Sequence, residues 1–427
     1  MRDSFNKNIY VCILFSLFAM GINQYSWLYF IDIDGFLSPS YKIIFGFCDL
    51  FFIVSALLFL LNRKNKKFIF IYACNLVILF LGLIIIELYF GNWMDPNKLN
   101  HLNIIKDRKL LIALNGLYES NSDTVLYTRD EYGFRGNYQD VTEIDILTIG
   151  GSTTDQRKIS DGQTFQDVLQ KEFRRIGKDV TVVNAGVDGQ STFGHIKNFD
   201  WWFPNIPDLK VRYYLFYIGI NDFYRNDEYS FDDLLYKHSG SLKQRIKYLI
   251  DIVAYNSSLS YLTKIIEGST LAYVHGLRHG DNSFSTVGWI DQPLLINHNN
   301  IMKRRLNTYE ERLILLCEKV QLFEAKLIFV TQSIKGKYTF IDGKLIGSNE
   351  VDNYNEYLYN SVDYYYMSRL LNNRTMKICK EYNGICIDLD NELNFDLGMD
   401  FYDSHHNTPA GAEKIGKYLF IKLQEIL

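Results

Sequence analysis

Three long apolar runs within the first ninety residues restrict the folding of this chain more than any other feature. They cover residues 9–31, 43–61 and 68–90. A helix that crosses a bilayer needs about 20 mostly apolar residues, and each run is long enough. The first run is too long for a secretory signal peptide and lacks a small-residue cleavage site. The sequence therefore predicts a membrane anchor of three transmembrane helices over residues 1–91.

The charges between these runs predict the orientation of the anchor. The loop at residues 62–67 carries four basic residues, whereas the loop at 32–41 carries two acidic residues and no basic one. Basic loops stay in the cytoplasm, so we expect the first loop and the N-terminus, with Arg2 and Lys7, to be cytoplasmic. Three crossings then put everything after Phe90 outside the cytoplasm, in a periplasmic or extracellular space.

Strand and helix patterns alternate in the remainder of the chain. Residues 92–140 are polar and irregular, and we expect a connector that packs on the following domain. From residue 141 to 427, short apolar runs alternate with helix-period segments, which predicts a three-layer α/β/α, flavodoxin-like fold with a parallel sheet. A segment at about 223–320 interrupts this pattern as an insertion. The expected strands cover residues 144–151, 180–186, 213–222, 325–332 and 384–390.

Polar residues follow several of these strands. Ser152 comes directly after two glycines, Gly189 lies in a turn, and Asn221 follows the third strand. Asp403 and His406 precede the last helix. The carboxyl ends of parallel strands meet at one edge of a sheet, so we expect these residues to gather there. A serine with a histidine base, a carboxylate and nearby N–H donors is the set that acyl transfer needs.

The motifs "GGSTT", "NAGVDG", "GIND" and "DSHHNTPAG" resemble, in this order, the four blocks of the SGNH hydrolase family, also called GDSL esterases. The resemblance runs from about residue 144 to the C-terminus, apart from the insertion, and GGSTT replaces the usual Gly-Asp-Ser. It implies a catalytic triad of Ser152, Asp403 and His406. It also implies an oxyanion hole formed by the N–H groups of Ser152 and Gly189 and by the Asn221 amide. No cofactor is implied.

Two adjacent histidines compete for the role of base. The family spacing D-x-x-H selects His406 rather than His405. His406 also lies two residues before the expected N-cap Thr408, where the positive end of the helix dipole favours a neutral imidazole. Adjacent residues of an extended loop point apart, so we expect His405 to face another way. No third ligand accompanies the two histidines, so no metal site is predicted.

Other residues near the strand ends are candidates for lining the substrate site. They are Arg135, Asp155, Gln156 and Gln332, and for each a purely structural role is the competing interpretation. With a net charge of −4, nothing in the composition points to a general nucleic-acid binder, and no nucleic-acid partner is expected. Cys379 and Cys386 are able to form a disulfide in an oxidising compartment, and unpaired thiols are an equal alternative.

These features together predict a membrane-anchored serine ester hydrolase that acts outside the cytoplasm. Its expected partners are the lipid bilayer and an acylated glycan or lipid of the envelope, from which it removes acyl or acetyl groups. An O-acyltransferase would use the same triad, with a sugar hydroxyl in place of water. A non-catalytic glycan-binding or scaffold protein is the third alternative.

Overall fold

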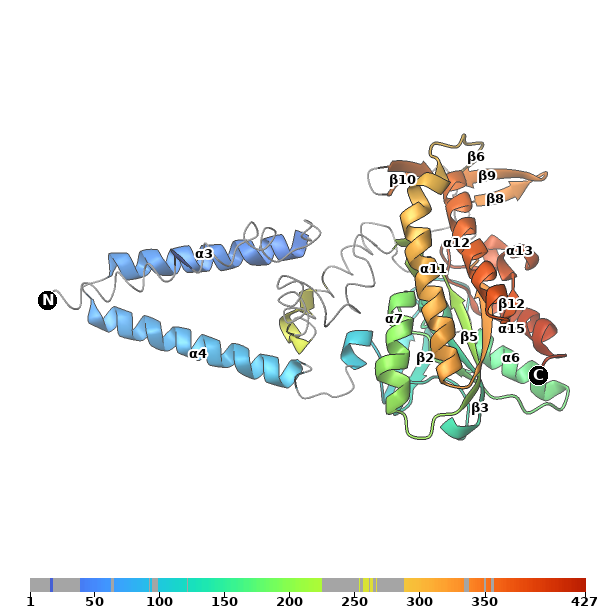
Figure 1. Cartoon of the computed structure of the whole chain (residues 1–427), viewed down its shortest axis with the longest axis horizontal. Helices are drawn as coiled ribbons and strands as arrows, with labels where there is room; N and C mark the ends of the chain where they lie inside the picture. Colours follow the sequence, from blue (N-terminus) through green and yellow to red (C-terminus); the bar gives the residue numbers. More distant parts are fainter. Residues whose placement is uncertain are drawn as a thin grey trace. The chain divides into compact units, whose positions relative to one another are not determined.

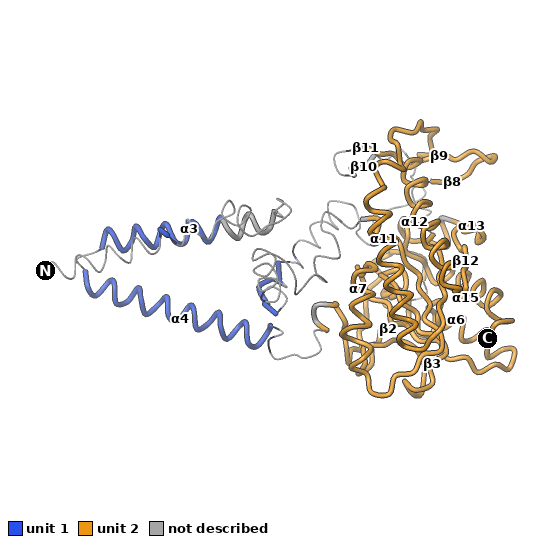
Figure 2. The backbone as a smooth tube through the Cα atoms, viewed as in Figure 1, with its two compact units in different colours: residues 1–96, 228–276 blue, residues 97–227, 277–427 orange. Residues whose placement is uncertain are grey.

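The computed structural model describes residues 39–62, 65–91, 99–120, 122–224, 288–333, 338–348, 351–354 and 357–427, with a few positions elsewhere. The chain divides into two compact units (Figure 2). Unit one comprises residues 1–96 and 228–276, and unit two comprises residues 97–227 and 277–427. Part of the predicted insertion thus groups with the apolar N-terminal runs rather than with the strand–helix domain.

Two apolar helices form most of the described part of unit one, α3 (Pro39–Leu61) and α4 (Lys66–Phe90). At the start of α4 the Asn65 side chain accepts a hydrogen bond from the Phe68 N–H, 3.0 Å away, and so caps the helix. Ser55 Oγ and Tyr72 OH lie 2.7 Å apart, and Phe59 packs edge-on against Tyr72. These contacts join α3 to α4.

The surface of α4 is apolar and exposed. Within the described residues, α4 is the one helix that is long and apolar enough to cross a membrane, and α3 adds a shorter apolar stretch, Gly46–Leu61. Of the first predicted span, residues 9–31, only positions 16 and 17 are described. Helices therefore stand where the second and third runs were predicted, whereas three membrane spans are not shown.

A five-stranded parallel sheet in the order β12-β7-β5-β3-β4 forms the centre of unit two (Figure 1). All five strands were predicted, and they are shorter than the apolar runs that indicated them. Nearly every residue of the two longest strands is buried, as expected for a parallel sheet covered on both faces. The strands are β3 (Ile144–Gly150), β4 (Val182–Asn184), β5 (Val211–Ile218), β7 (Lys326–Thr331) and β12 (Ile385–Ile387).

Helices cover both faces of the sheet. Successive side chains of a strand point to opposite faces, so the apolar strands present side chains to both helix layers. Ile146 and Leu215 belong to a buried core shared with α6 (Phe165–Arg175) and α15 (Pro409–Leu423). Their neighbours on the strands face the other way, where Phe216 stacks on Phe199. The helices α7 (Thr192–Lys197), α11 (His298–Leu322) and α12 (Ser361–Glu381) pack beside one another in that second layer (Figure 1).

Local capping fixes where the two helices of the first layer begin. Thr164 and Asp167 form a reciprocal capping box at the start of α6. Thr408 caps α15 by accepting a hydrogen bond from the Gly411 N–H, and Pro409 occupies the first turn. The predicted N-cap of the last helix is therefore confirmed, and this cap orients the loop that carries Asp403 and His406.

The structure corrects two predicted boundaries. Residues 92–140 are not irregular throughout, because β1 (Arg108–Ala113) and β2 (Thr124–Arg129) form an antiparallel hairpin. The insertion ends before residue 320, since α11 begins at His298 and packs on α7 and α12. The other elements are η1 (Leu99–Leu102), η2 (Val141–Glu143), α5 (Ser152–Asp155), η3 (Asn198–Trp202), η4 (Phe203–Asn205), α8 (Ile220–Tyr224), β6 (Trp289–Ile290), β8 (Tyr338–Ile341), β9 (Lys344–Ser348), β10 (Val351–Tyr354), β11 (Tyr357–Asn360), α13 (Leu389–Glu392) and α14 (Leu397–Asp400).

Cys379 and Cys386 form a disulfide in the structure, with their Cα atoms 5.8 Å apart. The pair joins the last turn of α12 to the middle residue of β12, so it links a helix of the second layer to an edge strand. Of the two alternatives open from the sequence, the structure has the paired form.

Candidate active site

Ser152 lies at the sharp transition from β3 to α5, and two glycines make this transition possible. A Cβ atom on Gly150 would lie 2.1 Å from Thr154 Oγ1 and 2.5 Å from the Tyr217 carbonyl oxygen. A Cβ atom on Gly151 would lie 2.0 Å from Asn221 Nδ2. Real Cβ contacts are not this short, so Gly150, which faces a backbone oxygen, requires glycine, whereas a side chain at Gly151 would displace the Asn221 amide. The GGS sequence thus serves close packing around the serine.

Three side chains form a continuous hydrogen-bonded chain at the carboxyl edge of the sheet. Ser152 Oγ lies 2.8 Å from His406 Nε2, although the two residues are 254 positions apart. His406 Nδ1 lies 2.7 Å from Asp403 Oδ2. The other carboxylate oxygen, Asp403 Oδ1, accepts hydrogen bonds from the N–H groups of His405 at 3.0 Å and His406 at 2.7 Å. The serine, base and carboxylate therefore have the connectivity of a catalytic triad.

The pKa values of His406 and Asp403 favour proton transfer from the serine to the histidine. Burial by itself lowers the pKa of His406, but the charge and hydrogen bond of Asp403 outweigh it, so the pKa lies above the ordinary 6.5. Burial by itself raises the pKa of Asp403, but the two imidazoles and the backbone donors hold it well below its usual range. The helix-dipole argument for a lowered histidine pKa is therefore wrong, because the charge and hydrogen bond of Asp403 determine the direction of the shift.

The predicted oxyanion-hole residues lie next to the serine. Asn221, in α8, places its Nδ2 against Gly151 and donates a hydrogen bond to the Gln190 carbonyl oxygen, 2.9 Å away. A side-chain amide has two N–H groups, so this bond leaves a second one for a substrate oxyanion. Gly189 has a φ of +73°, a conformation that glycine adopts without strain. The loop that carries Gly189 and the helix that carries Asn221 are thus joined directly by a hydrogen bond.

A buried ion pair next to the proposed oxyanion residue Asn221 was not anticipated from the sequence. Arg312 of α11 lies 3.1 Å from Asp222, and its Nε donates to Thr192 Oγ1 at 2.7 Å. Asp222 also accepts hydrogen bonds from the N–H of Thr192. Asp222 directly follows Asn221, and Thr192 lies three positions after Gly189. Arg312 therefore connects the two segments that carry these proposed oxyanion donors. The aspartate in "GIND" was the available signal, but its partner lies in a distant helix.

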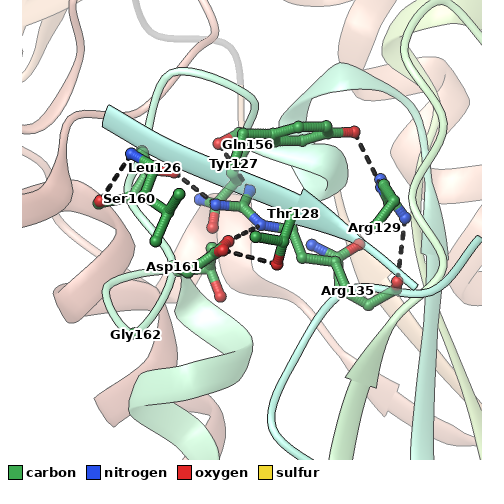
Figure 3. A network of polar contacts seen from close by, with 12 residues as sticks. Leu126, Tyr127, Thr128, Arg129, Arg135, Gln156, Ser160, Asp161 and Gly162 are labelled. Atoms are coloured by element: carbon green, nitrogen blue, oxygen red, sulfur yellow. Dashed lines mark hydrogen bonds and ion pairs between the residues drawn. The ribbon is translucent and has the colours of Figure 1, made fainter. Parts of the chain in front are cut away.

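The residues expected to line the substrate site are buried in internal networks. Figure 3 shows Arg135 with Asp161, to which its Nε donates a hydrogen bond at 2.7 Å. Arg135 also donates to the carbonyl oxygens of Asp155, Gln156 and Ile159. Gln156 Oε1 accepts a hydrogen bond from the Phe165 N–H at 2.8 Å. These contacts favour a structural role over substrate lining.

The other two candidates have similar surroundings. Asp155 forms a buried ion pair with Arg129, whose guanidinium also donates to the Gly186 carbonyl oxygen. Tyr127 OH donates to the same carboxylate at 3.0 Å. Gln332 Oε1 accepts a hydrogen bond from Thr153 Oγ1 at 3.2 Å. The contacts of Asp155 and Gln332 thus fix the segment that follows the nucleophile. Tyr127 and Arg129, which bind Asp155, come from β2, within the residues predicted as a connector.

His405 does not face away from His406 as predicted. The ring centroids of the two histidines lie 4.1 Å apart, and His405 is buried. Its Nδ1 is 2.8 Å from Ser404 Oγ. Within the described residues, Asp403, His405 and His406 form a group whose possible ligand atoms lie within 4.8 Å of one another, which is close enough to hold a metal ion. The polar atoms of Asp403 and His406 already bind each other, the serine and the backbone, which fits a triad rather than a metal centre.

A parallel α/β sheet with a Ser-His-Asp chain at its carboxyl edge defines an ester hydrolase of the SGNH class. The chain belongs to the GDSL-like Lipase/Acylhydrolase family, whose profile matches residues 146–419. It is accordingly a carboxylic ester hydrolase. The match begins at β3, so the β1–β2 hairpin and Arg129 lie outside it.

Solved structures with a similar fold are distant in sequence. TesA is 12% identical, with a TM-score of 0.35, and the similarity covers 66% of this chain and 99% of TesA. The psychrotrophic esterase EstA from Pseudoalteromonas sp. is 12% identical, with a TM-score of 0.36 and coverages of 66% and 97%. Axe2, an acetylxylan esterase from Geobacillus stearothermophilus, is 14% identical, with a TM-score of 0.36 and coverages of 66% and 94%. No curated protein sequence matches this chain.

Proposed function

We propose that this protein is a membrane-anchored serine esterase that works outside the cytoplasm through an acyl-enzyme on Ser152. It removes acyl or acetyl groups from envelope glycans or lipids. The observation that carries the proposal is the hydrogen-bonded chain from Ser152 Oγ to His406 and on to Asp403, with spacings of 2.8 and 2.7 Å. A serine hydroxyl becomes nucleophilic only when such a base takes its proton.

The reaction has two halves. Ser152 Oγ forms a bond to the ester carbonyl carbon while its proton passes to His406 Nε2. The resulting oxyanion accepts hydrogen bonds from the N–H groups of Ser152 and Gly189 and from the Asn221 amide, each worth about 3 kcal/mol. When the tetrahedral intermediate collapses, the ester C–O bond breaks and the alcohol leaves with the proton of His406. A water molecule then attacks the acyl-serine by the same steps, with His406 as base and then acid, and releases the acid product.

Three observations support an anchored enzyme in an oxidising, extracytoplasmic compartment. The helix α4 is apolar, exposed and 25 residues long, which suits a bilayer span. The four basic residues at positions 62–67 lie just before and at the start of this helix, which favours a cytoplasmic loop and an exit to the outside. The Cys379–Cys386 disulfide is typical of oxidising compartments. A tethered esterase in this place meets acylated components of the cell envelope.

The test uses the full-length protein in detergent, a chromogenic acetyl ester and a serine-directed fluorophosphonate. We expect ester hydrolysis and labelling of the wild type, and loss of both in Ser152→Ala. Ser120→Ala, an exposed serine of the loop after β1, is the matched control and should behave as wild type. Labelling that persists in Ser152→Ala would refute the assignment of the nucleophile.

A second arm separates hydrolysis from transfer. The same reaction is run with an oligosaccharide acceptor, and the acyl group is followed by mass spectrometry. Free acetate as the main product supports the esterase, whereas acetylated sugar would replace it with an O-acyltransferase. Absence of both turnover and labelling would leave a non-catalytic protein.

A further inference from the structure

Two tyrosines stack in series on the candidate catalytic base. The Tyr402 ring lies parallel to the His406 imidazole, at 7° between planes and 5.6 Å between centroids. The Tyr118 ring stacks in turn on Tyr402, at 27° and 6.0 Å. Neither tyrosine belongs to the triad or to the oxyanion hole, and Tyr118 lies outside the region matched by the family profile, residues 146–419.

The backbone holds Tyr402 in this position. Its N–H donates a hydrogen bond to the His406 carbonyl oxygen at 3.0 Å, and Phe401 and Asn407 pair as an antiparallel bridge. The loop from Phe401 to Asn407 therefore closes on itself and sets the tyrosine ring against the imidazole. Tyr402 is 8% exposed, so solvent has little access to this contact.

Tyr118 supports the stack from the loop between β1 and β2. Its hydroxyl donates a hydrogen bond to the Lys158 carbonyl oxygen at 2.6 Å, and Lys158 Nζ donates back to the Ala113 carbonyl oxygen at 2.9 Å. The hairpin is thus fastened to the segment that follows Ser152. Through Tyr118 the same hairpin contacts Tyr402.

The stack has a chemical consequence when the base is protonated. The face of an aromatic ring carries a negative partial charge and attracts a cation within about 6 Å of its centroid. His406 becomes an imidazolium as Ser152 attacks, and Tyr402 presents its ring within this distance. Burial raises the pKa of the Tyr402 hydroxyl well above its usual value, so the phenol stays neutral while the histidine titrates.

We propose that Tyr402, backed by Tyr118, is a positioning residue that holds the plane of His406 and stabilises its imidazolium form during ester hydrolysis. This inference rests on the proposed function. Several other groups also face or influence the imidazole. They are Asp403 and His405 of the same loop, Ser152 of α5, and Asp188 of the loop after β4. The variants below therefore change only the tyrosines, so that these other groups are the same in every pH profile that is compared.

The test compares Tyr402→Phe, Tyr402→Leu and Tyr118→Leu in the full-length protein. Tyr402→Leu should lower kcat about three- to thirtyfold with little change in KM, because ring stabilisation acts on the protonated base. The acid limb of its pH–rate profile should move to lower pH, since the imidazolium has lost a favourable contact. Tyr402→Phe keeps the ring and should retain wild-type kcat and pH profile. Tyr118→Leu should show a smaller loss in the same direction.

Matched controls separate this inference from general damage and from failure of the proposed function. Tyr357→Leu removes an exposed ring on β11 and should leave all parameters unchanged. If Tyr402→Leu fails to fold, Tyr118→Leu decides, since its ring stacks on Tyr402 and supports the base through that residue. Equal losses in Tyr402→Phe and Tyr402→Leu, or an unmoved acid limb, would overturn the inference. A wild type without esterase activity would instead overturn the proposed function.

Discussion

The Arg312 guanidinium lies 3.1 Å from the Asp222 carboxylate, and both side chains are almost completely buried. Asp222 directly follows Asn221, which places this ion pair behind the proposed oxyanion hole. A buried charge that loses its partner is far more costly than an exposed one, because water no longer solvates it.

Removing one member of this pair should therefore destabilise unit two. We expect Asp222→Ala to lower the free energy of unfolding by about 3–5 kcal/mol. The double variant Asp222→Asn, Arg312→Met should recover much of this loss, since it leaves no unpaired charge. The control is Asp291→Ala, which breaks the exposed pair with Lys344 and should cost at most about 1 kcal/mol. Thermal unfolding in one detergent measures all three, and equal effects at the two pairs would contradict this prediction.

The two adjacent histidines should differ sharply in their contributions to catalysis. His406→Ala removes the base that contacts Ser152 and should reduce kcat/KM by several orders of magnitude. His405→Ala removes the neighbouring ring, whose Nδ1 lies 2.8 Å from Ser404 Oγ, and we expect it to retain most activity. Initial rates with a chromogenic acetyl ester provide the measurement. A larger loss in His405→Ala would mean that the base has been assigned to the wrong histidine.

The pH dependence should follow the raised pKa of His406. The histidine acts as a base only when neutral, so kcat/KM should rise with pH through a value above the ordinary 6.5 and then level off. Asp403→Asn removes the negative charge that raises this pKa. In that variant the acid limb should move to lower pH, and the plateau should drop because the imidazolium loses its partner. An acid limb unaffected by Asp403→Asn would show that another group titrates.

A methyl group at Gly151 should disable the oxyanion hole without removing any catalytic side chain. In Gly151→Ala the new Cβ would meet Asn221 Nδ2 at 2.0 Å, so the amide has to move. Loss of one oxyanion donor lowers kcat by about 10²–10³. Gly398→Ala is the matched control, since the nearest atom to its Cβ is 3.8 Å away. Similar kcat values for the two variants would argue against a role for Asn221.

The proposed topology puts the C-terminus outside the cytoplasm. Fusions at Leu427 to an alkaline phosphatase, which works only outside, and to a fluorescent protein, which works only inside, should give phosphatase activity without fluorescence. Replacing the four basic residues at positions 62–67 with glutamine should weaken this orientation, because the charge bias is lost. Fluorescence from the unaltered protein would contradict this topology, because the anchor would then have one span fewer or the opposite orientation. The proposal of an envelope substrate would fail with it.

Local signals in the sequence were sufficient for the parts of the fold that depend on neighbouring residues. Apolar runs predicted all five strands of the central sheet, and Thr408 with Pro409 predicted the start of α15. The order of the four motifs also predicted that Ser152, Asp403 and His406 would meet. These features are readable because periodicity, capping and the edge rule for parallel sheets act over short distances or apply to every sheet of this kind.

The β1–β2 hairpin was not predicted, because its strands are partly exposed and the longest apolar run within them, residues 110–113, is short. Once folded, this hairpin brings Arg129 to Asp155 and Tyr118 to Tyr402. The same limit applies to Cys379 and Cys386, whose pairing depends on how the chain turns after α12.

The sequence by itself determined the five strands of the central sheet, the helices that cover it and the residues proposed to carry the chemistry. Tertiary structure decided their partners: Arg312 with Asp222, Tyr402 with His406, and His405 beside the base rather than turned away. The physical reason is that burial and charge pairing depend on distances between segments that are remote in the chain. A sequence pattern specifies that a side chain is polar or aromatic, whereas only the packed fold specifies which group it meets.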